Sequence, residues 1–246
     1  MCFHASLIST SEQLENRFDA KFVNQEVKSK FETSSYHLNG FEHPNLPIIT
    51  QELKDVVLPA VWGIVPTGED STALEAYYKK AARFGGGLNA KSEKLDSHFL
   101  YKHLYKNQRC LILIDAFFEP YHVNNNSFPY LIRRKDKQAF ALAGIYSRFD
   151  NGLITCSILT RKAMPYIAKI HNVKKRQPVM LNPDLEQQWL SQDLKDNDIF
   201  KIINSDYDDQ SLESYPVDKK LFSPKENSNM VDILKPVQYP ELNTLF

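Results

Sequence analysis

Residues 109–119 read Arg109-Cys-Leu-Ile-Leu-Ile-Asp-Ala-Phe-Phe-Glu119, a run rich in β-branched and aromatic side chains. Such a composition predicts a β-strand, here a single one over 109–119. Three similar runs follow at 128–133 (FPYLIR), 139–148 (AFALAGIYSR) and 153–161 (GLITCSILTR). The asparagines at 124–126 predict a turn between the first strand and the second. Four strands in close succession predict a mainly antiparallel, partly barrel-like sheet.

The segments around these strands predict short helices. Thr10 and Gln13 have the spacing of a capping box, which predicts a helix over about 11–20. The spacing of Leu74, Tyr77, Tyr78 and Ala81 predicts a helix over 71–84, ended by three glycines that permit left-handed backbone. Residues 162–170 are expected to be helical despite Pro165. Asn182 as N-cap and a proline after it predict a helix through Trp189.

The remaining segments complete an α+β reading. Residues 28–50 lack a helical period and are expected to be strand and loop, 56–66 is β-rich, and 179–181 is a short strand. The tail from about 215 carries four prolines and is expected to be extended chain packed on the body. Because no repeat, linker or shift in composition divides the 246 residues, we expect one domain over 1–246. Short helices are expected to flank the sheet of this domain.

Composition and charge exclude several classes of protein. The chain has 30 basic and 30 acidic residues, so it is not a polycation that binds duplex DNA non-specifically, although a local basic groove is compatible with that balance. Three cysteines without a CxxC pair argue against a disulfide framework or a structural zinc site. We expect no signal peptide and no membrane-spanning segment. We therefore expect a cytoplasmic protein with no metal and no cofactor.

The first two residues are Met1 and Cys2. Removal of the methionine would leave Cys2 with an α-amine and a thiol, a pair that condenses with aldehydes to a thiazolidine ring. Their reference pKa values, about 7.7–8.0 and about 8.5, would populate both nucleophilic forms near neutral pH. The alternative is an ordinary small residue at a frayed chain end.

Two acid–base candidates stand out. Glu119 is expected at the end of an apolar strand, and a carboxylate among phenylalanines would have a raised pKa suited to proton transfer. His171 follows an apolar stretch, and its near-neutral reference pKa suits an acid or a base. The alternatives are a solvent-facing glutamate and a structurally satisfied histidine; Cys2 with His171 could also form a thiol-protease-like pair.

Polar and basic residues provide further candidates. Asn89 follows the three glycines at 85–87, which suggests close backbone approach or a plain loop. Short basic clusters occur on the helix that carries Arg83, at 133–135 and at Lys174-Lys175-Arg176. Flanking a groove with Trp62, such clusters would suit a single-stranded nucleic acid; otherwise they are solvated faces. The sequence contains no Gly-rich phosphate loop, HExxH or GxSxG motif.

The order of these motifs along the chain is informative. The motifs are Met1-Cys2, Trp62-Gly-Ile-Val-Pro66, Leu88-Asn-Ala-Lys91, Arg109–Glu119, Phe140-Ala-Leu-Ala-Gly-Ile-Tyr146, Ile158-Leu-Thr160, Ile170-His-Asn172 and Arg176-Gln-Pro178. As an ordered set, they resemble the SOS response-associated peptidase (SRAP) family over nearly the whole chain, up to the segment Pro236–Leu242.

The resemblance implies a monomeric sensor of abasic sites in single-stranded DNA, nucleoid-associated when bound. Cys2, freed by autocatalytic removal of Met1, would form a Schiff base with the sugar aldehyde and close a thiazolidine crosslink that shields the lesion. The implied catalytic roles are proton transfer and Met1 removal for Glu119, ring opening and crosslink reversal for His171, and positioning of Cys2 or the sugar for Asn89. The implied DNA contacts are Lys91, Thr160 and Arg176, with Trp62, Arg83, Lys174 and Lys175 as further candidates.

Several positions depart from the family pattern. Phe3-His4 replace the usual Gly-Arg, which removes an expected phosphate contact. Lys91 stands for an arginine and loses its bidentate fork. The stretch from His171 to Pro178 is longer than in the family pattern.

Two other functions are alternatives to abasic-site capture. A trans-acting cysteine peptidase would turn over peptides at Cys2. A non-covalent nucleic-acid binding module would keep its function in a Cys2→Ala variant.

Overall fold

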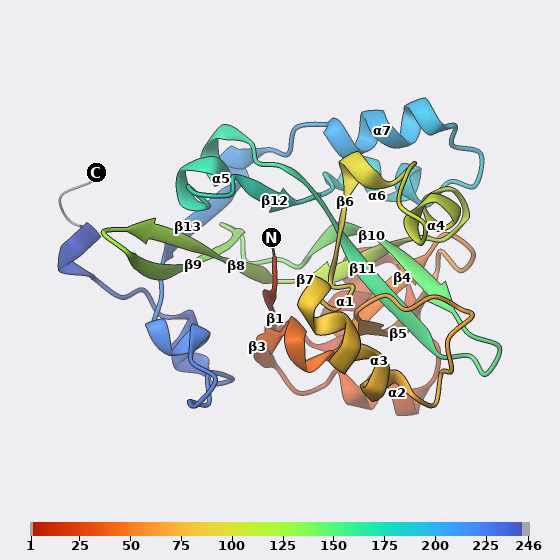
Figure 1. Cartoon of the computed structure of the whole chain (residues 1–246), viewed down its shortest axis with the longest axis horizontal. Helices are drawn as coiled ribbons and strands as arrows, with labels where there is room; N and C mark the ends of the chain where they lie inside the picture. Colours follow the sequence, from red (N-terminus) through yellow and green to blue (C-terminus); the bar gives the residue numbers. More distant parts are fainter. Residues whose placement is uncertain (1, 243–246) are drawn as a thin grey trace.

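The computed structural model describes residues 2–242, which form an α+β fold with two mostly antiparallel sheets. The first sheet has the order β13-β9-β8-β1-β3. Its strands are β1 (His4–Leu7), β3 (Ser35–Asn39), β8 (Ala116–Val123), β9 (Asn126–Arg134) and β13 (Leu212–Pro216). In Figure 1, β1 lies near the middle of the molecule, paired on one edge with β3 and on the other with β8.

The second sheet follows the path β12-β11-β10-β7-β4-β5-β2, and β6 pairs with β11. Its strands are β2 (Lys21–Phe22), β4 (Asn45–Thr50), β5 (Val56–Trp62), β6 (Asn89–Lys91), β7 (Arg109–Ile114), β10 (Phe140–Arg148), β11 (Ile154–Lys162) and β12 (Arg176–Pro178). A parallel pairing joins β11 to β5, which are the second strands from the two ends of this path. The sheet is therefore partly closed, as the sequence predicted.

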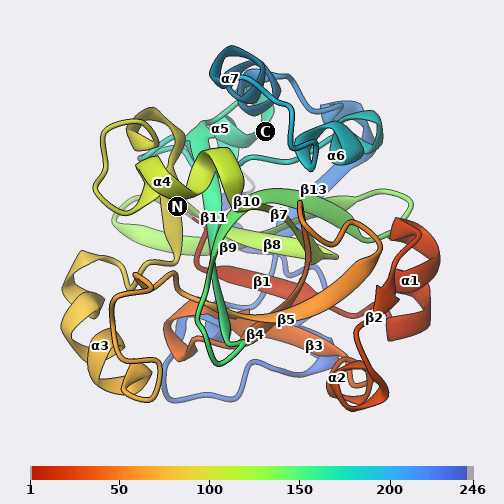
Figure 2. The same ribbon diagram turned by 90° about the vertical axis from the view of Figure 1, so that its right-hand side faces the viewer.

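Short helices flank the sheets on two sides. They are α1 (Ser11–Phe18), α2 (Gln25–Lys30), α3 (Leu74–Ala81), α4 (Tyr101–Asn107), α5 (Pro165–Ile170), α6 (Pro183–Trp189) and α7 (Asp196–Asn204). Figures 1 and 2 show α4, α6 and α7 on one side of the strands, and α2 and α3 on the other. Within residues 2–242, no helix is both long enough and apolar enough to cross a lipid bilayer.

The prediction of one strand over 109–119 is wrong, because the chain changes sheets at Asp115. Strand β7 ends at Ile114 in the second sheet, and β8 begins at Ala116 in the first. The Asp115 carboxylate accepts hydrogen bonds from the backbone N–H groups of Ile8 and Ser9 at 2.6 and 2.8 Å. These bonds tie the bend to the end of β1. Glu119 therefore lies inside β8 and not at a strand end.

The hairpin between β8 and β9 forms as predicted. Asn124 and Asn125 both have left-handed backbone, with φ of 48° and 63°, which suits a tight two-residue turn. The capping box at Thr10 also forms, since its hydroxyl accepts from the Gln13 N–H and the Gln13 side chain accepts from the Thr10 N–H. Both elements are specified by local side-chain chemistry.

Other boundaries differ from the predictions. Helix α3 begins at Leu74, and a short 3-10 turn over 82–84 follows it. Lys162 belongs to β11, and α5 begins at Pro165 because proline is tolerated in the first helical turn. The short strand expected at 179–181 is instead β12 at 176–178, and residues 25–30, partly expected to be strand and loop, form α2. Helices α4 and α7 had no predicted counterpart.

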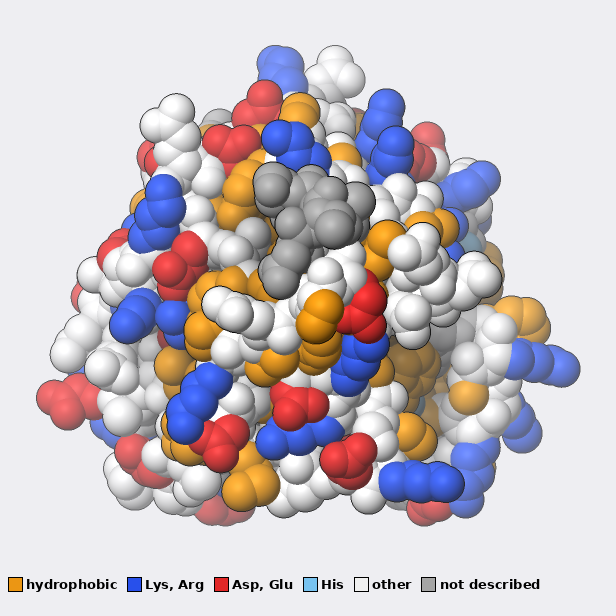
Figure 3. Space-filling model, turned by 90° about the vertical axis from the view of Figure 1, so that its left-hand side faces the viewer, with side chains coloured by type: hydrophobic (Ala, Val, Ile, Leu, Met, Phe, Trp, Pro, Cys, Tyr) orange, Lys and Arg blue, Asp and Glu red, His pale blue; other side chains and the backbone are white. Residues whose placement is uncertain are grey.

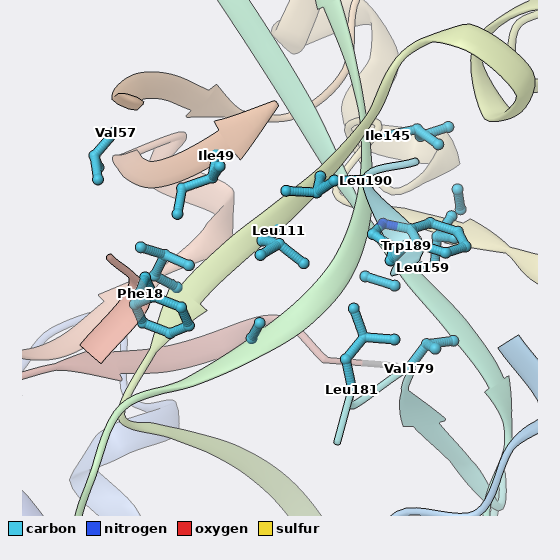
Figure 4. Packing of buried hydrophobic residues seen from close by; sticks show 14 of the residues in the cluster. Phe18, Ile49, Val57, Leu111, Ile145, Leu159, Val179, Leu181, Trp189 and Leu190 are labelled. Atoms are coloured by element: carbon cyan, nitrogen blue, oxygen red, sulfur yellow. The ribbon is translucent and has the colours of Figure 1, made fainter. Parts of the chain in front are cut away.

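The largest buried cluster lies between the second sheet and the outer helices (Figure 4). Trp189 of α6 is fully buried, and its indole N–H donates to the Cys110 carbonyl at 3.0 Å. Leu111 and Leu159 project from β7 and β11 into the same cluster. Burial of each such side chain contributes about 1.5–3 kcal/mol relative to exposure, so this packing holds the helices on the sheet.

The chain after β13 packs against the first sheet. It contains the 3-10 turns Lys219–Phe222, Val231–Leu234 and Pro240–Leu242. Val217, Leu221 and Ile233 are buried against Phe118 and Leu131. Figure 3 shows basic and acidic side chains interspersed on this face of the molecule, in line with the balanced charge of the sequence.

Candidate active site

Cys2, Asn89, Glu119 and His171 come from four separate segments and meet at one place. Cys2 precedes β1, Asn89 begins β6, Glu119 lies within β8, and His171 caps the C-terminus of α5. The antiparallel pairing of β1 with β8 sets His4 opposite Phe118, which brings the start of the chain beside Glu119. The fold therefore assembles all four predicted catalytic residues.

Asn89 holds the backbone of Cys2. Its side-chain N–H donates to the Cys2 carbonyl oxygen at 2.8 Å, and its Oδ1 is buried with no hydrogen-bond partner among residues 2–242. The turn before Asn89 depends on Gly87, which has φ of +70° and would set an added Cβ 2.5 Å from the Ile64 carbonyl oxygen. This glycine is required for the approach of Asn89 to Cys2.

Glu119 and His171 form a buried pair. The distance from Glu119 Oε2 to His171 Nδ1 is 3.2 Å, and the two side chains are 0% and 2% exposed. His171 Nδ1 also lies 2.8 Å from the Arg176 carbonyl oxygen, which can only accept, so Nδ1 carries the hydrogen. The other ring nitrogen, Nε2, is then a hydrogen-bond acceptor in the neutral imidazole.

Burial shifts the pKa of both groups. Desolvation raises the pKa of Glu119 to about 7, as expected for a carboxyl group in an apolar strand. Desolvation also lowers the pKa of His171 to about 4. The expectation of a near-neutral pKa for His171 is therefore wrong, because burial disfavours the imidazolium, and the ring is neutral at neutral pH.

The Cys2 thiol is buried as well. Its side chain has no exposed surface, and Sγ lies 3.6 Å from the His4 carbonyl oxygen as a donor. Desolvation raises the pKa of Cys2 far above its ordinary value, and the nearby Glu119 carboxylate raises it further. The expectation of a populated thiolate near neutral pH is wrong for this state of the protein, because a buried thiol keeps its proton.

A cavity of about 410 Å³ opens beside the Glu119–His171 pair. Glu119 and His171 form part of its wall, together with Phe3, His4 and Lys174. The site thus combines a buried acid–base pair with a space large enough for a small ligand.

The predicted DNA contacts divide into exposed and engaged side chains. Lys91, Arg83, Lys174 and Lys175 are exposed. Arg176 is engaged: its guanidinium forms a bidentate ion pair with Glu93, with bonds of 2.5 and 3.0 Å, and donates to Thr160. Thr160 itself is fully buried next to Lys91 in the β6–β11 pairing.

The structure does not place Trp62 where a base could stack on it. The ring is fully buried, and its indole N–H donates to the Leu88 carbonyl at 2.9 Å. Strand β5 directs this side chain into the core because its apolar residues are buried between neighbouring strands. The expectation that Trp62 contacts DNA is corrected accordingly.

Sequence reasoning missed a buried polar chain next to the cavity. His4 Nδ1 lies 2.9 Å from His37 Nε2, and His37 Nδ1 lies 2.6 Å from the Ser228 hydroxyl. Glu93, the partner of Arg176, was also missed. No local pattern marks these residues, since each pairing joins segments far apart in the sequence.

Comparison with known proteins agrees with this architecture. The family model described as SOS response associated peptidase (SRAP) matches residues 1–224. This chain belongs to that family.

Individual relatives extend the match. The abasic site processing protein YoqW of Bacillus subtilis is 30% identical over 172 residues, covering 68% of this chain and 71% of that protein. The abasic site processing protein YoaM of the same organism is 26% identical over 233 residues, covering 93% and 96%. A crystal structure of a protein from Bacteroides thetaiotaomicron superposes with a TM-score of 0.83, at 26% identity, covering 96% of this chain and 100% of that one.

Proposed function

We propose that this protein processes abasic sites in single-stranded DNA by capturing the lesion covalently at Cys2. Its relatives YoqW and YoaM bear the name abasic site processing protein, which supports this choice of lesion. The observation that carries the proposal is that Asn89 bonds to Cys2, while Glu119, whose charge reaches the Cys2 thiol, pairs with His171 at the wall of a cavity.

The chemistry needs a free amine on Cys2, hence removal of Met1. The ring-opened abasic sugar is an aldehyde. The Cys2 amine attacks its carbonyl carbon, water leaves, and an imine forms. The thiol then adds to the imine carbon, its proton ends on the nitrogen, and a thiazolidine closes. The sum is one aldehyde and one aminothiol converted to one ring and one water.

Proton transfer in these steps falls to Glu119 and His171. With a pKa of about 7, Glu119 can both accept and return a proton near neutral pH, which is what a thiol with a raised pKa requires. His171 keeps its Nδ1–H on the Arg176 carbonyl, so Nε2 is the atom left to exchange a proton with the sugar oxygen. The same pair would assist the removal of Met1.

The strand itself would be held by local cations rather than by net charge. Lys91, Arg83, Lys174 and Lys175 are exposed and carry the phosphate contacts in this proposal. Balanced overall charge is compatible with that role, because single-strand binding depends on a local basic track.

The test is a denaturing gel with a labelled single-stranded oligonucleotide that carries one abasic site. Protein confirmed by intact mass to lack Met1 should give a shifted band that resists denaturation. Cys2→Ala should lose the stable band. Cys2→Ser should give a band only after borohydride reduction, since its amine can form the imine but no thiol closes the ring.

Cys110→Ala is the matched control, because Cys110 is equally buried but lies in β7. It should crosslink like the unaltered protein. Absence of any band from protein lacking Met1 would sink the proposal. Turnover of peptides by Cys2 would favour a peptidase, and unchanged DNA protection by Cys2→Ala would favour a non-covalent binder.

A further inference from the structure

The cavity lined by Glu119 and His171 also has Phe3, the residue that follows Cys2, in its wall. Its volume of about 410 Å³ lies within the usual range for small ligands, roughly 300–1,000 Å³. Phe3, Phe118 and Phe222 provide apolar wall on one side. Of the four exposed cations assigned to the strand, only Lys174 is among the described residues that line it.

The polar part of the lining favours an anion. Lys174 stands at the wall near His171, close enough that its charge contributes to the lowered pKa of that ring. His122 adds a second side chain that can donate to an anion. Glu119 is the one carboxylate among the lining residues, and it lies fully buried against His171. The lining thus combines the positive charge of Lys174 with the Glu119–His171 pair.

The orientation of His4 is fixed. Its Nδ1 is bonded to His37, which is bonded in turn to Ser228, and the ring packs 5.2 Å from Phe222. With Nδ1 engaged, the second ring nitrogen of His4 is the one left for a ligand in the cavity. In the tautomer in which His37 Nε2–H donates to His4 Nδ1, His4 Nε2 carries the hydrogen and can donate to a phosphate oxygen.

We propose that the cavity also admits free small aldehydes that carry a phosphate, and that Cys2 condenses with them without DNA. This inference rests on the proposed function, because it uses the same free amine and thiol of Cys2. Lys174 and His4 would hold the phosphate, and Glu119 would move the proton.

The reaction balances without a further reagent. The aldehyde carbon bonds to the Cys2 nitrogen, its oxygen leaves as water, and the sulfur adds to the same carbon while the thiol proton passes to nitrogen. The product mass is that of the protein plus the aldehyde minus one water. Because the ring consumes both nucleophiles, the adduct also blocks crosslinking to an abasic site until it reverses.

The experiment measures the formation of the adduct by intact mass over time, once with glycolaldehyde phosphate and once with glycolaldehyde. The protein must lack Met1, and a short peptide beginning Cys-Phe-His is the reference for the uncatalysed rate. We expect the protein to react with the phosphate-bearing aldehyde about a hundredfold faster than the peptide does, the lower end of acid–base catalysis. It should prefer that aldehyde over glycolaldehyde by about fivefold, the scale of one partly exposed ion pair.

Variants isolate the phosphate contact. Lys174→Gln should remove the preference while both aldehydes still react. Lys169→Gln is the matched control, because Lys169 is an exposed lysine on α5 outside this cavity, and it should leave the preference intact. Protein loaded with glycolaldehyde phosphate should no longer crosslink an abasic oligonucleotide.

An abasic oligonucleotide is run in parallel with the same preparation. If DNA crosslinks but glycolaldehyde phosphate reacts no faster than with the peptide, this inference is overturned and the proposed function stands. If neither reacts, the proposed function fails. Equal acceleration of both aldehydes would overturn the assignment of a phosphate to the cavity.

Discussion

Asp115 and Glu119 are two buried carboxylates four residues apart. Asp115 has a structural role, whereas Glu119 belongs to the candidate active site. Asp115 accepts two backbone N–H groups and the Ser9 hydroxyl, so its oxygens are committed to the bend between the sheets. Glu119 faces His171 and Cys2. Burial raises the pKa of both groups, so a raised pKa alone does not identify a catalytic carboxylate. The difference lies in what each carboxylate contacts.

The largest expected effect comes from removing each carboxylate in turn and comparing the rate and the stability of the two variants. Glu119→Gln should slow crosslinking roughly a hundredfold or more, since it removes the group that accepts the thiol proton, with little loss of stability. Asp115→Ala should leave the rate of the folded protein nearly unchanged. It should cost about 2–4 kcal/mol of unfolding free energy, because the N–H groups of Ile8 and Ser9 lose their acceptor.

Single-turnover kinetics and denaturant unfolding of both variants measure whether the rate falls only in Glu119→Gln and the stability only in Asp115→Ala. Asp115→Asn keeps one acceptor oxygen and should recover most of the stability. A severe rate defect in fully folded Asp115→Asn would contradict the separation of the two roles.

The pH dependence of stability gives a smaller but more specific effect. Glu119 has a folded pKa of about 7 against a reference value of 4.5, so the folded state binds this proton more tightly than the unfolded state. Its stabilising contribution is full below pH 4.5 and is lost as pH rises through 7. Relative to Glu119→Gln, the unaltered protein should therefore lose about 3 kcal/mol of stability across that window.

Denaturant unfolding of both proteins at several pH values measures that difference directly. Asp115 is present in both proteins, so its contribution cancels in the difference between their stabilities. Stability curves that run parallel for the two proteins would show that Glu119 has an ordinary pKa in the folded state.

The smallest effect concerns a third carboxylate, Glu93, whose side chain is 51% exposed and paired with Arg176. Glu93→Gln should free the guanidinium and remove a repulsion with phosphate. In a Cys2→Ala background, we expect its affinity for single-stranded DNA to rise about two- to fivefold and its salt dependence to steepen. Fluorescence anisotropy at several salt concentrations measures both quantities.

Glu26→Gln is the matched control, since Glu26 is an exposed partner of Lys30 on α2 and far in sequence from the site. It should change affinity by less than Glu93→Gln. Equal effects of the two variants would mean that only overall charge matters and that Arg176 has no part in binding the strand.

The sequence predicted those features of the fold that depend on neighbouring residues. The capping box at Thr10 and the asparagine turn at 124–126 formed, because each is specified within a few residues. The helix after Asn182 also formed, but the Asn182 side chain makes no cap bond; it donates to the Asp206 carbonyl and accepts from the Asp208 N–H. The long run from 109 to 119 was misread as one strand. Its apolar composition is continuous, and only the bonds from Asp115 to the end of β1 divide it.

Candidate site residues show the same division. Cys2, Asn89, Glu119 and His171 could be named from motif order, and the structure brings them together. Trp62 was predicted to contact DNA, yet its neighbours across the sheet bury it. The Arg176–Glu93 pair and the His4–His37–Ser228 chain were not foreseen, since they join segments separated by tens of residues.

By itself, the sequence determined the family, the α+β class and the identity of the residues able to do aldehyde chemistry. The tertiary structure alone decided their protonation and access. Charge in a protein depends on solvent exposure and on neighbours a few ångströms away. Packing of β1 against β8 and of α5 against the first sheet therefore set the pKa values of Glu119 and His171, which no stretch of sequence encodes.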